Sequence, residues 1–225
     1  SSKLKILSSL CFNSFLNNNI YVEGIKDIDQ TDIDNANKLG FKIKLLGYAE
    51  LINNKIYQRV HPTLIKKDSY VASIDGVLNA VIVDGKPVGR STIQGEGAGP
   101  EATTSALVSD ISSVLRGNTK FPFSISSKKR KNLKFEKIDE RYFSAYLRFE
   151  VLDKPGVLSN ITNIFSKYRV SIKRLVQNPD KNTKTSSIII VTHITKDKYL
   201  KKIIKEISKR NYIKQKPKLI RIDNN

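Results

Sequence analysis

The stretch LRFEVLDKPGVLSNITNIFSKYRVSIKRLVQ, residues 147–177, contains three structural elements in succession. Apolar and polar residues alternate over 143–150, which predicts a strand with one face on a core. The sequence Asp-Lys-Pro-Gly at 153–156 is typical of a turn. Apolar residues then recur at helical spacing as far as Tyr168, and a second strand is predicted around Ile172.

The rest of the C-terminal region repeats this arrangement. A β-branched run over 187–191 predicts a third strand, and apolar positions over 199–207 predict a second helix. Residues 213–220 can close a fourth strand. The order βαββαβ is that of a ferredoxin-like fold, with two helices on one face of an antiparallel sheet. We therefore expect residues 140–225 to form one domain, preceded by a linker over 120–139 that is rich in serine and basic residues.

Residues 1–119 are expected to form a first α+β domain with a mixed, mostly antiparallel sheet and helices on one face. An opening helix with Leu4, Leu7, Leu10 and Cys11 on one face predicts that Cys11 is buried. A second helix is predicted from Thr31, as its N-cap, to Gly40. Strands follow over 41–45 and 56–60, joined by a turn at Asn53–Asn54.

A second hairpin and a glycine-rich loop complete this domain. The apolar run 77–83 predicts a strand, Asp84-Gly85 predicts a type I′ turn, and 88–93 is the returning strand. The loop GEGAG, residues 95–99, precedes a helix from Pro100 to about Arg116. Its glycines indicate either close approach of the backbone to a ligand or a tight strand-to-helix turn.

Composition narrows the function classes. The chain has 225 residues, a formal net charge of +19, one cysteine and no methionine. The lysines are scattered, apart from clusters over 128–131 and 214–218, so we expect a solvated basic surface and no nucleic-acid partner. No apolar run is long enough to span a bilayer and no signal peptide is evident, which predicts no membrane partner and a cytoplasmic location.

Three phrases carry a resemblance to a known family: FKIKLLGYAEL at 41–51, QRVHPTLIKKDSYVASIDGVLNAVIVDGKPVG at 58–89 and GEGAGPEATTSALVSDI at 95–111. In order and spacing they resemble the catalytic core of homoserine dehydrogenases. The resemblance implies NAD- or NADP-dependent interconversion of L-homoserine and L-aspartate 4-semialdehyde in threonine and methionine biosynthesis, by a homodimer or homotetramer. It places Gly97 and Gly99 beside the nicotinamide cofactor.

The opening residues SSKLKILSSL resemble the end of the family's signature, whose closing lysine corresponds to Lys3. The resemblance implies that Lys3 transfers the proton of the substrate hydroxyl, whereas without it Lys3 is one solvated lysine among many. The family's Rossmann domain, which binds most of the cofactor, and its substrate-binding carboxylates would precede Ser1. Residues 1–225 alone are therefore expected to be inactive and to be a segment of a longer product.

Residues 147–177 resemble the ACT domain, a regulatory module that often binds amino acids at the turn after its first strand. The resemblance implies that an effector such as threonine binds at Asp153, Gly156, Val157, Asn160 and Ile172. An anion can be held there by free N–H groups at the start of the helix. The alternative is that the domain binds nothing and pairs subunits.

A second hypothesis for the whole chain is a non-catalytic ACT-containing module that regulates or dimerises. The single histidine before a proline, His61, is expected to be structural. Glu23 is expected in a surface loop without a role. No cysteine and histidine cluster has metal-ligand spacing, so no metal site is predicted.

Overall fold

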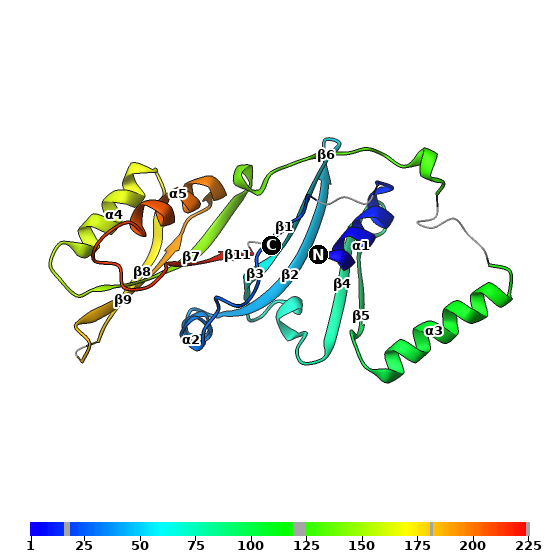
Figure 1. Ribbon diagram of the computed structural model, residues 1–225, viewed down its shortest axis with the longest axis horizontal. Coiled ribbons are helices and arrows are strands. Elements are labelled where there is room, and N and C mark those ends of the chain that lie inside the picture. Colours follow the sequence, from blue (N-terminus) through cyan, green and yellow to red (C-terminus); the bar gives the residue numbers. More distant parts are fainter. Residues whose placement is uncertain (16–18, 119–124, 181, 224–225) are drawn as a thin grey trace. The chain divides into compact units, whose positions relative to one another are not determined.

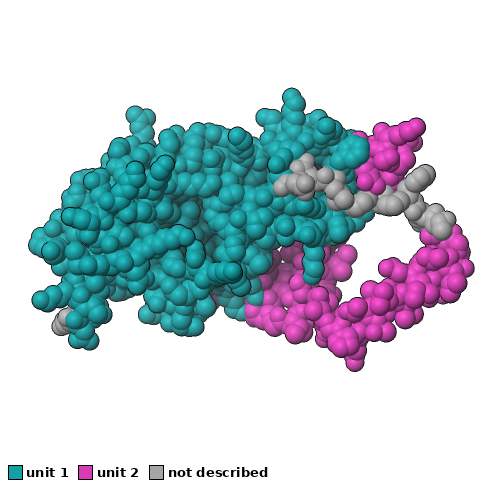
Figure 2. Space-filling view, viewed as in Figure 1, with its two compact units in different colours: residues 1–66, 131–225 teal, residues 67–130 magenta. Residues whose placement is uncertain are grey.

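The computed structural model describes residues 1–15, 19–118, 125–180 and 182–223 (Figure 1). They form two compact units, one of residues 1–66 with 131–225 and the other of residues 67–130 (Figure 2). Both units contain helices and β-strands, which confirms the α+β class. The predicted division at residues 119 and 140 stays a prediction, and residues 120–124 of the predicted linker lie outside the described residues.

The described part of the first unit is built on a nine-stranded sheet. The longest pair is antiparallel, with β2 (Phe41–Ile52) along β3 (Lys55–Lys66), and Asn53 and Asn54 form the predicted turn with φ of 49° and 59°. Short strands β1 (Tyr21–Val22) and β6 (Lys134–Phe135) run parallel to β3. This sheet is therefore mixed, as predicted, but its parallel partners come from segments far apart in the sequence.

The βαββαβ order of the C-terminal region is confirmed. The elements are β7 (Tyr142–Leu152), α4 (Val157–Lys167), β8 (Ile172–Asp180), β9 (Thr185–Thr192), α5 (Asp197–Ile207) and β11 (Lys218–Ile222), with the two-residue β10 (Thr195–Lys196) beside β7. Their spatial order is β11-β7-β9-β8, and α4 and α5 lie together over the sheet (Figure 1). Apolar side chains of both helices and of β7 and β9 share one buried cluster. The last strand starts at Lys218, not at residue 213, because the bridge at Ile213 is isolated and Pro217 cannot donate a ladder hydrogen bond.

The two N-terminal helices differ from the prediction in detail. Helix α1 (Ser2–Phe12) has Leu4 of the predicted stripe against Gly47 of β2, but it buries Ser8 and Ser9 and leaves Leu10 and Cys11 exposed. The prediction of a buried Cys11 was wrong. Helix α2 (Gln30–Lys38) is capped by Asp29 and not by Thr31.

The second unit contains the hairpin and the glycine loop. Strand β4 (Leu78–Gly85) continues through Asp84 and Gly85 to pair with β5 (Gly89–Glu96), so the predicted turn at this dipeptide was wrong and residues 86–88 make the turn. Helix α3 (Pro100–Leu115) begins at Pro100 as predicted. Short 3-10 helices lie at Tyr70–Ser73 and Ser127–Lys129 in this unit, and at Ile138–Glu140 in the first.

Candidate ligand, cofactor and catalytic positions

The turn between β7 and α4 exposes the start of a helix. Gly156 caps α4 with φ of 85°, a left-handed conformation that favours glycine. The amide of Val157 donates to the carbonyl of Lys154 at 3.3 Å. Among the described residues, the amides of Leu158 and Ser159 have no backbone acceptor. Two N–H groups at the positive end of α4 therefore remain available to an anion.

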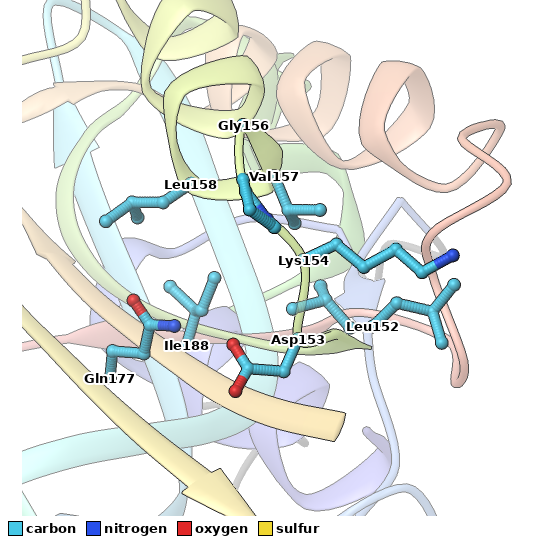
Figure 3. A pocket seen from close by; sticks show the side chains of 10 residues that line it. Leu152, Asp153, Lys154, Gly156, Val157, Leu158, Gln177 and Ile188 are labelled. Carbon is cyan, nitrogen blue, oxygen red and sulfur yellow. The ribbon is translucent and has the colours of Figure 1, made fainter. Parts of the chain in front are cut away.

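A cavity of about 440 Å³ lies beside this turn. Its lining comes from β7, the turn, α4, β8 and β9, and consists of Val151, Leu152, Asp153, Lys154, Pro155, Gly156, Val157, Leu158, Gln177 and Ile188. In Figure 3 the carboxylate of Asp153 and the amide of Gln177 face the same space beside Ile188. A carboxylate, an amide and a helix N-terminus around an apolar floor match the groups of a small amino acid.

Three of the five residues predicted for this site line the cavity, namely Asp153, Gly156 and Val157. Asn160 does not, since its Nδ2 donates to the carbonyl of Gly156 at 2.9 Å from one turn along the helix. Ile172 lies at the start of β8 and lines a different hollow. Sequence reasoning missed Gln177 and Ile188, which are paired across β8 and β9 and meet the turn only in the folded sheet.

The two glycines of the loop before α3, Gly97 and Gly99, lie in different surroundings. Gly99 is the N-cap of α3 with φ of 128°, and a Cβ at that position would meet no atom within 4 Å. The carbonyl of Gly99 accepts from the Thr103 hydroxyl at 2.8 Å. At Gly97, by contrast, a Cβ would lie 1.7 Å from Nδ2 of Asn79. Gly99 thus leaves open space beside a helix N-terminus, which fits a phosphate or cofactor, whereas the space at Gly97 is filled from within the protein.

Lys3 is an exposed residue in the first turn of α1. It belongs to the first unit, while Gly97 and Gly99 belong to the second. Its role in proton transfer stays a prediction.

His61 and Glu23 belong to a buried polar network on one face of β3. His61 is fully buried, its Nε2 lies 3.0 Å from an Arg59 nitrogen, and its Nδ1 lies 2.9 Å from the Pro62 carbonyl. The arginine can only donate, so the imidazole is neutral with its proton on Nδ1. Burial and the cations of Arg221 and Arg59 lower the pKa of His61 to about 4. This arrangement agrees with the structural role predicted for His61.

Glu23 follows β1 in a loop, as predicted, and its side chain is 35% exposed, but that side chain is paired. Its carboxylate accepts a hydrogen bond from Arg221 at 2.8 Å, and its amide donates to the Val60 carbonyl at 2.8 Å. The side chains of Arg221 and Asp197 are both fully buried, with Nε of the arginine 2.6 Å from Oδ1 of the aspartate. The signal for this pairing was absent from the sequence because Glu23 and Arg221 lie almost the whole chain apart.

Within the described ranges, no three histidine, cysteine, aspartate or glutamate side chains are grouped so as to hold a metal ion. In the same ranges, no helix has the length and apolar character needed to cross a membrane.

The fold and the cavity define a class of protein in which an ACT-type domain is joined to a second α+β segment. Residues 1–112 match the family model of homoserine dehydrogenase, and residues 145–211 match that of the ACT domain. The homoserine dehydrogenase of Neisseria gonorrhoeae is 35% identical over 232 residues, which cover 98% of this chain and 52% of that protein. That of Helicobacter pylori is 33% identical, with 99% and 52% covered.

A crystal structure gives the same result at the level of fold. A homoserine dehydrogenase from Thiobacillus denitrificans has 34% identity and a TM-score of 0.85, over 98% of this chain and 52% of that one. The chain belongs to the homoserine dehydrogenase family. It spans about half the length of the curated relatives that it matches.

Proposed function

We propose that residues 1–225 carry the C-terminal catalytic segment and the regulatory domain of an NAD- or NADP-dependent homoserine dehydrogenase. The reaction converts L-homoserine and NAD(P)⁺ to L-aspartate 4-semialdehyde, NAD(P)H and a proton. The observation that carries the proposal is the family match over residues 1–112, within a relationship that extends along 98% of the chain. A non-catalytic module is not favoured, because the match includes the catalytic segment.

The chain's own residues would divide the chemistry between them. The nicotinamide, when bound, accepts the hydride from the substrate carbon. Lys3 takes the proton of the substrate hydroxyl, which must leave as the carbonyl forms. Gly99 lets the backbone before α3 approach the cofactor, because no side chain stands there and nothing fills the space. Most of the cofactor would be held outside residues 1–225.

The cavity at the start of α4 is the proposed effector site. An amino acid would place its carboxylate against the free amides of Leu158 and Ser159 and its ammonium group near Asp153. Gln177 supplies a donor and an acceptor for a polar side chain, so threonine is the proposed effector. We place the enzyme in threonine and methionine biosynthesis in the cytoplasm, as a homodimer or homotetramer.

The activity is tested on a chimera that joins the unmatched half of the Neisseria gonorrhoeae relative to residues 1–225. We expect homoserine-dependent reduction of NAD⁺ or NADP⁺ by the chimera and none by residues 1–225 alone. Lys3→Ala should lower kcat by about 10² or more, the usual contribution of a general base. Lys5→Ala, the same charge change on the same helix, is the control. If kcat is unchanged in Lys3→Ala, Lys3 has no part in the chemistry. A chimera that folds but is inactive would contradict the proposed reaction.

Effector binding is tested by calorimetry on residues 1–225 with threonine, methionine, isoleucine and serine. We expect heat with threonine that Asp153→Ala abolishes. Asn160→Ala should leave binding intact, because Asn160 lies outside the cavity lining. If none of the four amino acids binds, the domain serves to pair subunits.

A further inference from the structure

Asn79 and Gly97 share one backbone acceptor at the end of the β4–β5 hairpin. The ladder ends at the pair Leu78 and Glu96, with Asn79 opposite Gly95. The amide of Gly97 then donates to the Val77 carbonyl at 3.2 Å. Nδ2 of Asn79 donates to the same carbonyl, also at 3.2 Å. Gly97, the first residue after β5, is thus tied to the residue before β4 at the point where the strands separate.

The side chain of Asn79 also occupies the place that a side chain at position 97 would take. A Cβ on Gly97 would lie 1.7 Å from Nδ2 and 2.4 Å from Cγ of Asn79. A Cβ on Gly95, directly opposite Asn79, would meet nothing within 4 Å. A side chain at 97 would therefore displace the end of Asn79, whereas Gly99 requires glycine for its positive φ.

We propose that Asn79 is a positioning residue for the cofactor loop. By filling the space over Gly97 and bonding to Val77, it fixes where the chain leaves β5, three residues before α3 begins at Pro100. A shift of the loop would move Gly99 and the helix amides relative to the bound cofactor, and small displacements of this kind lower rates strongly. The proposal rests on the proposed function for its consequence, but the positioning itself is a property of this hairpin.

The positioning is tested first without catalysis, by hydrogen exchange in residues 1–225. Asn79→Ala should speed exchange of the Gly97 amide about tenfold, as expected for a loosened hydrogen bond. Gly97→Ala should do the same, because the new Cβ displaces the flexible end of Asn79. The double variant should show no further increase, since both changes remove one interaction. Gly95→Ala is the matched control and should leave exchange unchanged.

The consequence is tested in the chimera described above. Asn79→Ala should raise KM for the nicotinamide cofactor about tenfold, with the KM for homoserine less affected. Asn79→Asp keeps the shape of the side chain and removes its hydrogen-bond donor. A smaller rise of KM in this variant than in Asn79→Ala would separate the filling of space from hydrogen bonding.

Unchanged exchange in Asn79→Ala, or additive effects in the double variant, would overturn the positioning role whatever the activity. An inactive chimera with the expected exchange pattern would count against the proposed function alone, whereas normal kinetics of Asn79→Ala in an active chimera would overturn the link to the cofactor.

Discussion

Arg221 and Arg148 show how single residues connect segments that lie far apart in the sequence. Arg221 is fully buried and bonds to Asp197 and Glu23. Arg148 is 4% exposed and bonds to Asp32 of α2 at 2.7 Å. Burial opposes the charge of Arg148, yet the hydrogen bonds and charge of Asp32 raise its pKa overall. Removing one partner of such a pair leaves an uncompensated buried charge, so these contacts fix the arrangement of the segments they join.

His61 predicts a pH dependence of stability at the residue scale. Its pKa is about 4 in the folded chain against an ordinary value of 6.5, because burial and nearby arginines oppose its positive charge. Between pH 6.5 and 4 the unfolded chain binds a proton that the folded chain does not. The free energy of unfolding should therefore be highest above pH 6.5. It should decrease by roughly 3 kcal/mol as the pH falls to about 4.

Urea unfolding at pH 7.5 and pH 5 measures this effect. His61→Gln should remove most of the difference between the two pH values. His193→Gln should keep it, because His193 is exposed. Equal stability of the unchanged chain at both pH values would contradict the assignment of a buried neutral His61.

At the scale of elements, the junction between β7 and α4 combines a left-handed glycine with a helix start. Strand β7 lies inside the sheet, and at its end Leu152 pairs with Thr185 of β9 and donates to the Tyr212 carbonyl at 2.9 Å. The chain then reverses within the Asp153–Gly156 turn, where the positive φ of Gly156 directs Val157 into the buried cluster. The cavity lies beside this turn, where, among the described residues, the amides of Leu158 and Ser159 have no backbone acceptor.

Gly156→Ala tests the backbone requirement of this turn. A Cβ there would meet no atom within 4 Å, so the expected loss of about 1–2 kcal/mol comes from the left-handed conformation alone. Gly24→Ala is the matched control, because its Cβ also meets nothing and its φ is not positive. Urea denaturation gives both values. A loss in Gly156→Ala no larger than in Gly24→Ala would contradict the strain argument.

At the scale of the whole molecule, the ferredoxin-like region is joined to the N-terminal segment through its sheet. Its edge strand β11 pairs parallel with β3 through Arg221 and Ile222. The face of the sheet opposite α4 and α5 packs against α2, where Ala36 shares a buried cluster with Tyr146 and Ile189. The ferredoxin-like region therefore contacts the N-terminal segment both through β11 and through α2.

This arrangement predicts that residues 140–225 are unstable when expressed alone. Without residues 1–66 the fragment would expose the edge of β11 and the apolar face that α2 covers, both of which favour aggregation. We expect dye binding to exposed apolar surface and a lower unfolding midpoint than for residues 1–225. A monodisperse fragment with the same midpoint as the full chain would contradict this view.

The sequence by itself determined the elements whose pattern is local. Alternation and helical spacing predicted β7, α4 and α5, and Asn53–Asn54 predicted the β2–β3 turn. The phrases around His61 and the glycine loop carried the family resemblance, which the family match confirmed. Such signals are visible because side-chain periodicity and turn chemistry are set by neighbouring residues.

The tertiary structure alone decided which distant residues meet. It brought Glu23 to Arg221, Gln177 into the cavity beside Asp153, and the side chain of Asn79 over Gly97. It also exposed Cys11, whose spacing had predicted burial. Long-range strand pairing and the packing of one element on another set these contacts, and neither leaves a periodic trace in a single sequence.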